Sequence, residues 1–168
     1  MAVGGPFELM TKADIDLTLL GSLAMLLYGA HAALERMLAQ GSGKIVNIGA
    51  AGGRIQNRGL VVYNSCQAGV VGCTRNLARE MAPRGISVTG VAPAIMVTPE
   101  LVQMVLDPQN DQQRAGRGAI LESIQTNVQL GQVSLPEEVA NTVAYLCSEA
   151  ADYMCGQTID VAGGQWMN

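Results

Sequence analysis

The apolar and polar positions of the chain fall into alternating helical and extended patterns. Apolar residues recur at helical spacing from about Lys12 to Gln40, and Thr11 precedes them as a plausible helix cap. A short run rich in β-branched residues, Lys44–Ile48, follows and is typical of a buried parallel strand. The same alternation continues to the end of the chain. It predicts helices over about Tyr63–Ala82 and Glu137–Glu149, with Pro136 in the first turn of the latter, and strands over Ile86–Val91 and Gln157–Val161.

Helices that alternate with strands predict an α/β fold with a parallel sheet and right-handed crossovers. The 168 residues suit one packed domain, residues 1–168, and are too few for two ordinary ones. Gly49–Gly59 is expected to form a glycine-rich loop. Glu100–Leu130 is expected to hold one or two short helices around a polar break at Asp107–Arg114.

The long first helix carries an unusually apolar stretch. The run Leu17–Ala33 is interrupted by glycine, serine and histidine, which favours a buried helix over a membrane span. Within it, Leu17–Leu27 is apolar almost all round, and such a helix is expected to be buried in something larger than its own small domain. With no targeting segment recognised before this run, a cytoplasmic protein is the default expectation.

Charge and cysteine content exclude several classes of function. Ten Lys and Arg against 14 Asp and Glu give a formal charge of −4, which argues against a nucleic-acid partner. The four cysteines form no CxxC pair and His31 is the only histidine, so a zinc or iron–sulfur site is not expected. The cysteines are expected to be small buried hydrophobic side chains in a reducing compartment.

Five stretches, taken together and in order, resemble the short-chain dehydrogenase/reductase family. The resemblance covers essentially the whole chain and implies a truncated Rossmann-like, three-layer fold with about three parallel strands and four to six helices. It also implies that the first strands, which carry the dinucleotide site of this family, are lacking, so no cofactor-binding residue is expected in this chain. The glycines of Gly49–Gly53 follow the wrong strand for a phosphate loop. The matching stretches are Gly43–Ile48, Tyr63–Gly69, Leu77–Gly85, Val91–Pro93 and Val161–Gln165.

The resemblance assigns four positions to the catalytic set of this family, and only one of them keeps the family residue. Tyr63 stands at the position of the tyrosine that protonates the substrate carbonyl. Gln67 stands where the family has a lysine, Ala50 where it has a serine, and Ser22 where it has an asparagine. The catalytic set is therefore expected to be degenerate, with none of it intact.

No other side chain is expected to replace the missing groups. Gln67 is neutral and cannot stabilise a tyrosinate, and Ala50 has no hydrogen-bonding side chain. Lys44 begins the strand that precedes Ala50 and lies roughly 16–20 Å away along it. Ser65, two residues after Tyr63, points to another side of the helix. The Pro-Gly turn of the family reads Pro93-Ala94 here, and Thr98 matches a threonine that contacts the cofactor amide in the family.

The parts of the family that associate with neighbouring subunits are retained. They are the two long helices, the last helix and the last strand, together with a tail at Gln165–Asn168. The favoured hypothesis is therefore a non-catalytic subunit of a hetero-oligomeric dehydrogenase. Its partner would be a full-length relative that binds NAD(P), and a hydroxyacyl-CoA is the first substrate class to consider.

Two alternatives remain open at this point. One is a cofactor-independent isomerase, hydratase or cyclase that uses Tyr63 as a general acid, which would need a nearby carboxylate such as Glu100 or Asp107. The other is a homo-oligomeric scaffold protein or a gene fragment. A dehydrogenase that borrows its cofactor site from a neighbour is a further, less favoured possibility, because the lysine and serine are absent.

Overall fold

Three parallel strands form the centre of the molecule. The computed structural model describes residues 3–109, 117–118 and 128–167. Within them the sheet has the order β1 (Gly43–Ile48), β2 (Ile86–Pro93) and β3 (Thr158–Val161). Gly43 is paired with Ile86, and Gly90 with Thr158. The predicted strands are confirmed, with ends that differ by one or two residues.

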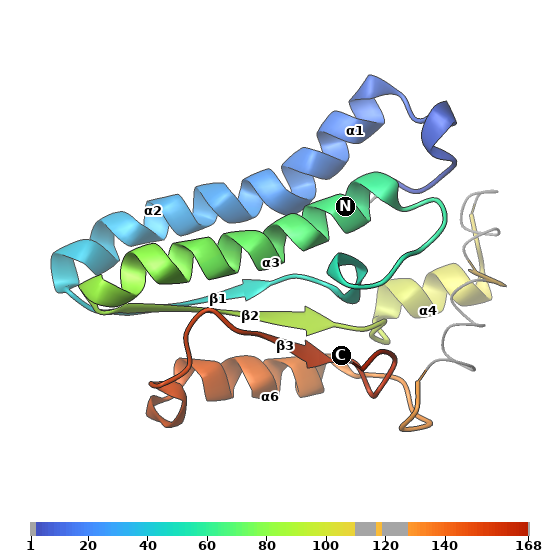
Figure 1. The fold of residues 1–168 in the computed structure, drawn as a ribbon. Helices are drawn as coiled ribbons and strands as arrows, with labels where there is room; N and C mark the ends of the chain where they lie inside the picture. The colour runs from blue at the N-terminus through green and yellow to red at the C-terminus, as the bar shows by residue number, and fades with distance from the viewer. Residues whose placement is uncertain (1–2, 110–116, 119–127, 168) are drawn as a thin grey trace.

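Helices cover both faces of the sheet, which confirms the predicted three-layer α/β fold (Figure 1). One face carries α1 (Lys12–Leu19), α2 (Met25–Gln40) and α3 (Val61–Met81). The opposite face carries α6 (Pro136–Cys147), and α4 (Pro99–Leu106) lies beyond the carboxyl end of β2. Short 3₁₀ turns stand between these elements at Phe7–Leu9, Ala51–Gly53, Ala82–Arg84 and Glu149–Ala151.

The core consists of two apolar clusters, one on each face of the sheet. Because side chains alternate along a strand, β1 directs Ile45 toward α2 and α3 and Val46 toward α6. The central strand β2 is buried on both faces, and Val88 and Val91 are fully inaccessible. A buried polar link ties β1 to α3: Asn47 Nδ2 donates to Thr74 Oγ1 at 2.9 Å. Thr74 Oγ1 in turn donates to the Val70 carbonyl of its own helix.

The predicted first helix is continuous from Lys12 to Gln40, but its middle is not α-helical. Thr11 caps it as expected, accepting from the Asp14 N–H, while its own N–H donates to the Asp14 carboxylate. Between α1 and α2 runs a π-helical segment, Leu20–Ala24 (η2), in which the Met25 N–H donates to the Leu20 carbonyl. Such bulges recur at functional sites, and the sequence pattern did not predict this one.

The apolar stretch of this helix is exposed in the single chain, so its burial in something larger than this domain stays a prediction. Leu20, Met25 and Tyr28 are 55%, 64% and 67% exposed. The helix contacts α3 and β1 on one side only, and no described element covers its other side. Lys12–Gln40 is long and apolar enough to cross a membrane, with a mean hydropathy of 1.6 over a window that is 11% buried. Core helices of soluble proteins can have the same length and composition, so these two properties are weak evidence for a membrane span.

The other helices differ from the prediction mainly at their ends. Helix α3 begins two residues earlier, at Val61, and α6 ends at Cys147 because Ser148 takes an extended backbone that breaks the helix before Glu149. Helix α4 confirms the first part of the predicted helical stretch Glu100–Leu130. The rest of that stretch lies mostly outside the described residues.

Candidate functional site

A cavity of about 580 Å³ runs along β1. Every residue from Lys44 to Gly49 lines it. Since successive side chains of a strand point to opposite faces, a cavity lined by all of them faces the edge of the strand rather than one face. Its opposite wall is the long first helix, through Gly21, Ser22, Met25, Leu26, Gly29, Ala30, Ala33 and Met37. At the carboxyl end of β1 the cavity reaches α3, where Tyr63 and Gln67 line it.

Three of the four positions assigned by resemblance therefore meet in this cavity. Ser22 comes from the π-helical segment, Tyr63 from the first turn of α3, and Gln67 from the next turn of α3. Ala50 follows the end of β1 and precedes the 3₁₀ turn Ala51–Gly53, but it is not among the lining residues. The geometry thus brings together a phenol, an amide and a hydroxyl.

The environment of Tyr63 makes it a weak acid. Burial raises the pKa of Tyr63 above its ordinary value, and the neighbouring Cys66 thiol adds to the effect. No described cation opposes this, so the phenol is neutral at physiological pH. A tyrosine that transfers protons near pH 7 needs its pKa shifted in the opposite direction.

Gln67 is buried, with 7% of its surface exposed, and its amide oxygen Oε1 has no hydrogen-bond partner. A Cβ placed on Gly49 would lie 3.4 Å from this oxygen, which is ordinary van der Waals contact, so Gly49 lies directly beside it at the end of the strand. A buried amide oxygen without a donor costs about 1–3 kcal/mol. The cavity thus presents an unused acceptor next to Tyr63.

The other polar candidates of the sequence lie elsewhere. Lys44 Nζ donates to the Ser148 carbonyl and to Asp152 Oδ1, each at 2.5 Å, and so points toward the C-terminal end of α6. Ser65 Oγ donates to the Val61 carbonyl of its own helix at 2.8 Å. Neither side chain supplies a charge or a hydroxyl group to Tyr63.

The two candidate carboxylates also lie outside the cavity. Glu100 is exposed in the first turn of α4, and Asp107 is exposed at its end. Thr98 caps this helix by accepting from the Leu101 N–H at 3.2 Å. Among the residues that the structure describes, no aspartate or glutamate lines the Tyr63 cavity, and no cluster of three or more metal-ligating side chains occurs.

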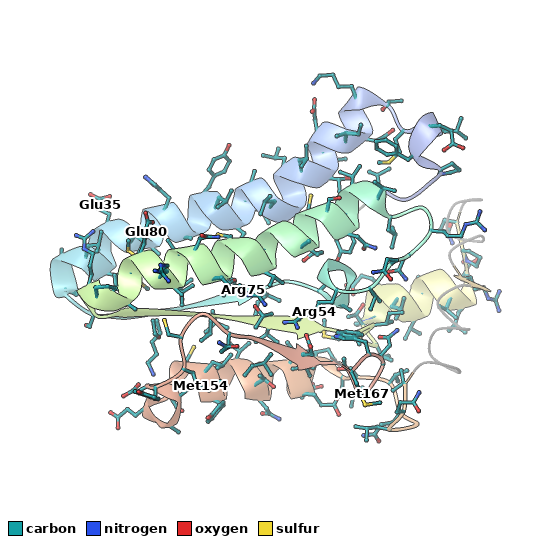
Figure 2. All side chains as sticks on the ribbon, in the orientation of Figure 1. Glu35, Arg54, Arg75, Glu80, Met154 and Met167 are labelled. Carbon is teal, nitrogen blue, oxygen red and sulfur yellow. The ribbon has the colours of Figure 1, made fainter. Side chains whose placement is uncertain are left out.

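Arg54 holds the glycine-rich loop in place, a role that the sequence did not indicate. Its side chain lies over the sheet (Figure 2). Its Nη2 donates to the Thr158 carbonyl at 2.9 Å, and its Nε lies 3.2 Å from Asp160 Oδ1. The loop is thereby joined to β3, 104 residues along the chain. A Cβ on Gly53 would lie 2.7 Å from the Gln67 carbonyl oxygen, so this glycine serves close packing against α3.

The comparisons with known proteins agree with this fold. The family described as enoyl-(acyl carrier protein) reductase matches residues 1–165. The chain belongs to the short-chain dehydrogenase/reductase family. It is 38% identical over 135 residues to the 3-oxoacyl-[acyl-carrier-protein] reductase of Staphylococcus aureus strain Mu50, a match over 80% of this chain and 50% of that protein. The Vibrio harveyi reductase of the same name is 36% identical over 82% of this chain and 52% of its own length.

Solved dehydrogenases of this family share the fold at lower identity. An Agrobacterium tumefaciens protein assigned as a 2-deoxy-D-gluconate 3-dehydrogenase, with bound NADP, superposes with a TM-score of 0.84 at 29% identity. A Beutenbergia cavernae protein assigned as a gluconate 5-dehydrogenase gives 0.81 at 29%. Each match covers 98% of this chain, the long apolar helix included, and 63% or 62% of the solved chain. The chain spans about half the length of the curated relatives it matches.

The dinucleotide that this family implies does not fit the described residues around Tyr63. Gln67 is neutral, and the one cationic residue along the cavity, Lys44, directs its ammonium group to Asp152. The glycines of the neighbouring loop pack against α3 and leave no cradle for a phosphate. We therefore assign no hydride-transfer step to this cavity.

Proposed function

We propose that the chain is a non-catalytic structural or regulatory subunit of a hetero-oligomeric, NAD(P)-dependent short-chain dehydrogenase. A full-length relative in the same complex would bind NAD(P) and carry out the reaction. The curated relatives are named 3-oxoacyl-[acyl-carrier-protein] reductases. Reduction of a 3-oxo group gives a hydroxyl group. This supports a hydroxyacyl-CoA or a related thioester as the substrate of the complex, and we place the complex in the cytoplasm.

The observation that carries the proposal is the electrostatics of the Tyr63 cavity. A tyrosine becomes a useful acid or base when a nearby cation lowers its pKa. Here burial raises the pKa of Tyr63, and the position one helical turn away is a neutral glutamine. The described residues offer no cation to reverse this.

A second observation supports association. The long helix exposes an apolar surface, called here the helix surface. It is made of Leu17, Leu20, Leu27 and Tyr28, whose side chains are 44–67% exposed. Contiguous apolar surface of this kind marks protein interfaces in soluble proteins. The helix is shared with the solved relatives, since they superpose over 98% of the chain.

The alternatives receive less support. A cofactor-independent enzyme would need a second acid or base beside Tyr63, and none of the described carboxylates lines the cavity. A homo-oligomeric scaffold would use the helix surface equally well. The chains found in the native complex distinguish the two: a scaffold would contain copies of this chain alone, and a subunit would be found with a full-length relative.

Native mass spectrometry of the complex, isolated through a tag on this chain from cells that express its gene neighbourhood, tests the proposal. We expect a heteromer that contains a full-length, NAD(P)-binding relative. Its turnover should be unchanged by Tyr63→Phe in this chain and lost when the corresponding tyrosine of the partner is replaced. A homo-oligomer without another protein, or a heteromer inactivated by Tyr63→Phe, would contradict the proposal.

A further inference from the structure

The glycine-rich loop is fastened to the last strand by Arg54. The loop follows β1, whereas the partners of Arg54 lie on β3, beyond the central strand β2, so this side chain reaches across the sheet. Its Nη2 donates to the Thr158 carbonyl, and its Nε faces Asp160 Oδ1. Gly90 of β2 is paired with Thr158, and a Cβ there would lie 2.8 Å from Thr158 Oγ1. The central strand therefore carries no side chain beside this contact.

The contact of Arg54 with Asp160 is an ion pair that is shielded from water. The two side chains are 19% and 23% exposed, and the facing atoms, Nε and Oδ1, are themselves buried. Neither atom has a hydrogen-bond partner among the described residues, so the ion pair is what compensates their burial. Removing one member of such a pair leaves the other charge buried and unpaired, which costs far more than the loss of an exposed pair such as Lys12 and Asp16.

The other side of the same loop packs against the first turns of α3. A Cβ on Gly53 would lie 2.7 Å from the Gln67 carbonyl oxygen, and one on Gly52 would lie 3.4 Å from Tyr63 Cε1. The backbone of the loop thus touches both residues that α3 contributes to the cavity. Because Arg54 directly follows these two glycines, its contact with β3 fixes the part of the loop that lies against Tyr63.

We propose that Arg54 is a positioning residue for Tyr63: by fastening the glycine-rich loop to β3, it holds the loop backbone against the two helical turns that carry Tyr63 and Gln67. The Tyr63 ring is then buried in part by the loop, and its surroundings depend on β3, at the other edge of the sheet from β1. Without the ion pair, the loop moves off α3 and water reaches the phenol. The burial that raises the pKa of Tyr63 is then reduced.

Replacement of Arg54 by methionine tests the proposal on the full chain without a partner. Arg54→Met keeps most of the length and the apolar stem of the side chain and removes its charge. We expect the pKa of Tyr63 to fall toward the ordinary tyrosine value of about 10, as measured by ultraviolet titration after subtraction of the matching Tyr63→Phe curve. We also expect hydrogen exchange to become at least about tenfold faster at the amides of Gly53 and Ile55, which bond within the loop. Exchange at Val88, in the core, should not change.

Three further variants assign the effect to the ion pair. Arg58→Met is the matched control, because it makes the same substitution at an exposed arginine of the same loop, and it should leave both measurements unchanged. Arg54→Lys keeps a positive charge next to Asp160 and should preserve most of the protection. Asp160→Asn should shift both measurements in the same direction as Arg54→Met. The double variant should change no more than Arg54→Met alone, because both substitutions act on one pair.

Several outcomes would overturn the inference. They are an unchanged pKa of Tyr63 in Arg54→Met, an equal effect of Arg58→Met, additive effects of the Arg54 and Asp160 substitutions, and exchange that rises equally at Val88, which would indicate a general loss of stability. If Arg54→Met does not fold, Asp160→Asn provides the same test with the same expected directions. All of these measurements use the single chain, so their failure is distinct from a failure of the proposed subunit role.

Discussion

Tyr63 and Gln67 face one cavity from successive turns of α3, and the identity of residue 67 decides what the tyrosine can do. With glutamine, burial dominates and raises the pKa of Tyr63. Ionisation is therefore harder in the folded chain than in the unfolded one. Stability that depends on the neutral phenol is present below the unfolded pKa of about 10 and is lost as the pH rises from there through the folded pKa.

Replacing Gln67 with lysine should reverse this balance. An ammonium group one helical turn away favours the phenolate, so Gln67→Lys should lower the pKa of Tyr63, by about 1 to 3 pH units. Ultraviolet titration measures the pKa of the tyrosines. Because the chain has four of them, the titration curve of the Tyr63→Phe variant is subtracted to isolate Tyr63. Ser65→Lys adds the same charge at an exposed position on the same helix and should leave the pKa in place. An equal effect of the two lysines would show that Gln67 does not control Tyr63.

The sequence predicted which residues lie near Tyr63 better than it predicted the backbone geometry and long-range contacts around them. Aligning the motifs placed Ser22, Tyr63 and Gln67, and the structure brings these three into one cavity. The π-helical segment that carries Ser22 had no periodic signal, because one extra residue in a turn leaves the apolar pattern almost unchanged. The contact of Arg54 with β3 joins segments 104 residues apart, so no local pattern could predict it.

Helix and strand positions follow closely from local rules, and their junctions depend on backbone geometry. The structure confirms the predicted first residues of helices and strands to within about two positions. The signals were Thr11, Pro136 and the β-branched runs. The break after Cys147 depends on the extended backbone of Ser148, which composition alone does not reveal. The exposure of the apolar helix depends on what lies beside it, and this too is absent from any local pattern.

The junctions that precede β1 and β2 touch each other, and this contact gives a prediction. Gly85 has φ of +78°, and a Cβ there would lie 2.3 Å from the Gly41 carbonyl oxygen. Gly85→Ala should lower the free energy of unfolding by at least about 1–3 kcal/mol. Gly72→Ala, in open space within α3, should raise it by about 0.4–1 kcal/mol. Urea unfolding followed by circular dichroism gives both values, and equal stability of the two variants would contradict the close approach.

Two features of the described residues stand out at the scale of the molecule. No cation is directed at Tyr63 in its cavity, and the long apolar helix is exposed. Each feature alone has an ordinary explanation. Site residues can differ between relatives, and the surface of any folded protein carries some apolar residues. Together they support the proposal that this chain contributes contacts rather than chemistry to a larger assembly.

Leu20 provides the sharpest test of association at the helix surface. It is 55% exposed in the chain, so Leu20→Asp should leave the fold and its circular dichroism unchanged. In the complex the carboxylate would be buried against apolar side chains without a partner, a cost large enough to weaken association by at least about tenfold. Leu106→Asp is the matched control, because Leu106 is 73% exposed on α4, away from the long helix. Native mass spectrometry should show the heteromer with Leu106→Asp and the free chain with Leu20→Asp, and an intact heteromer in both would place the interface elsewhere.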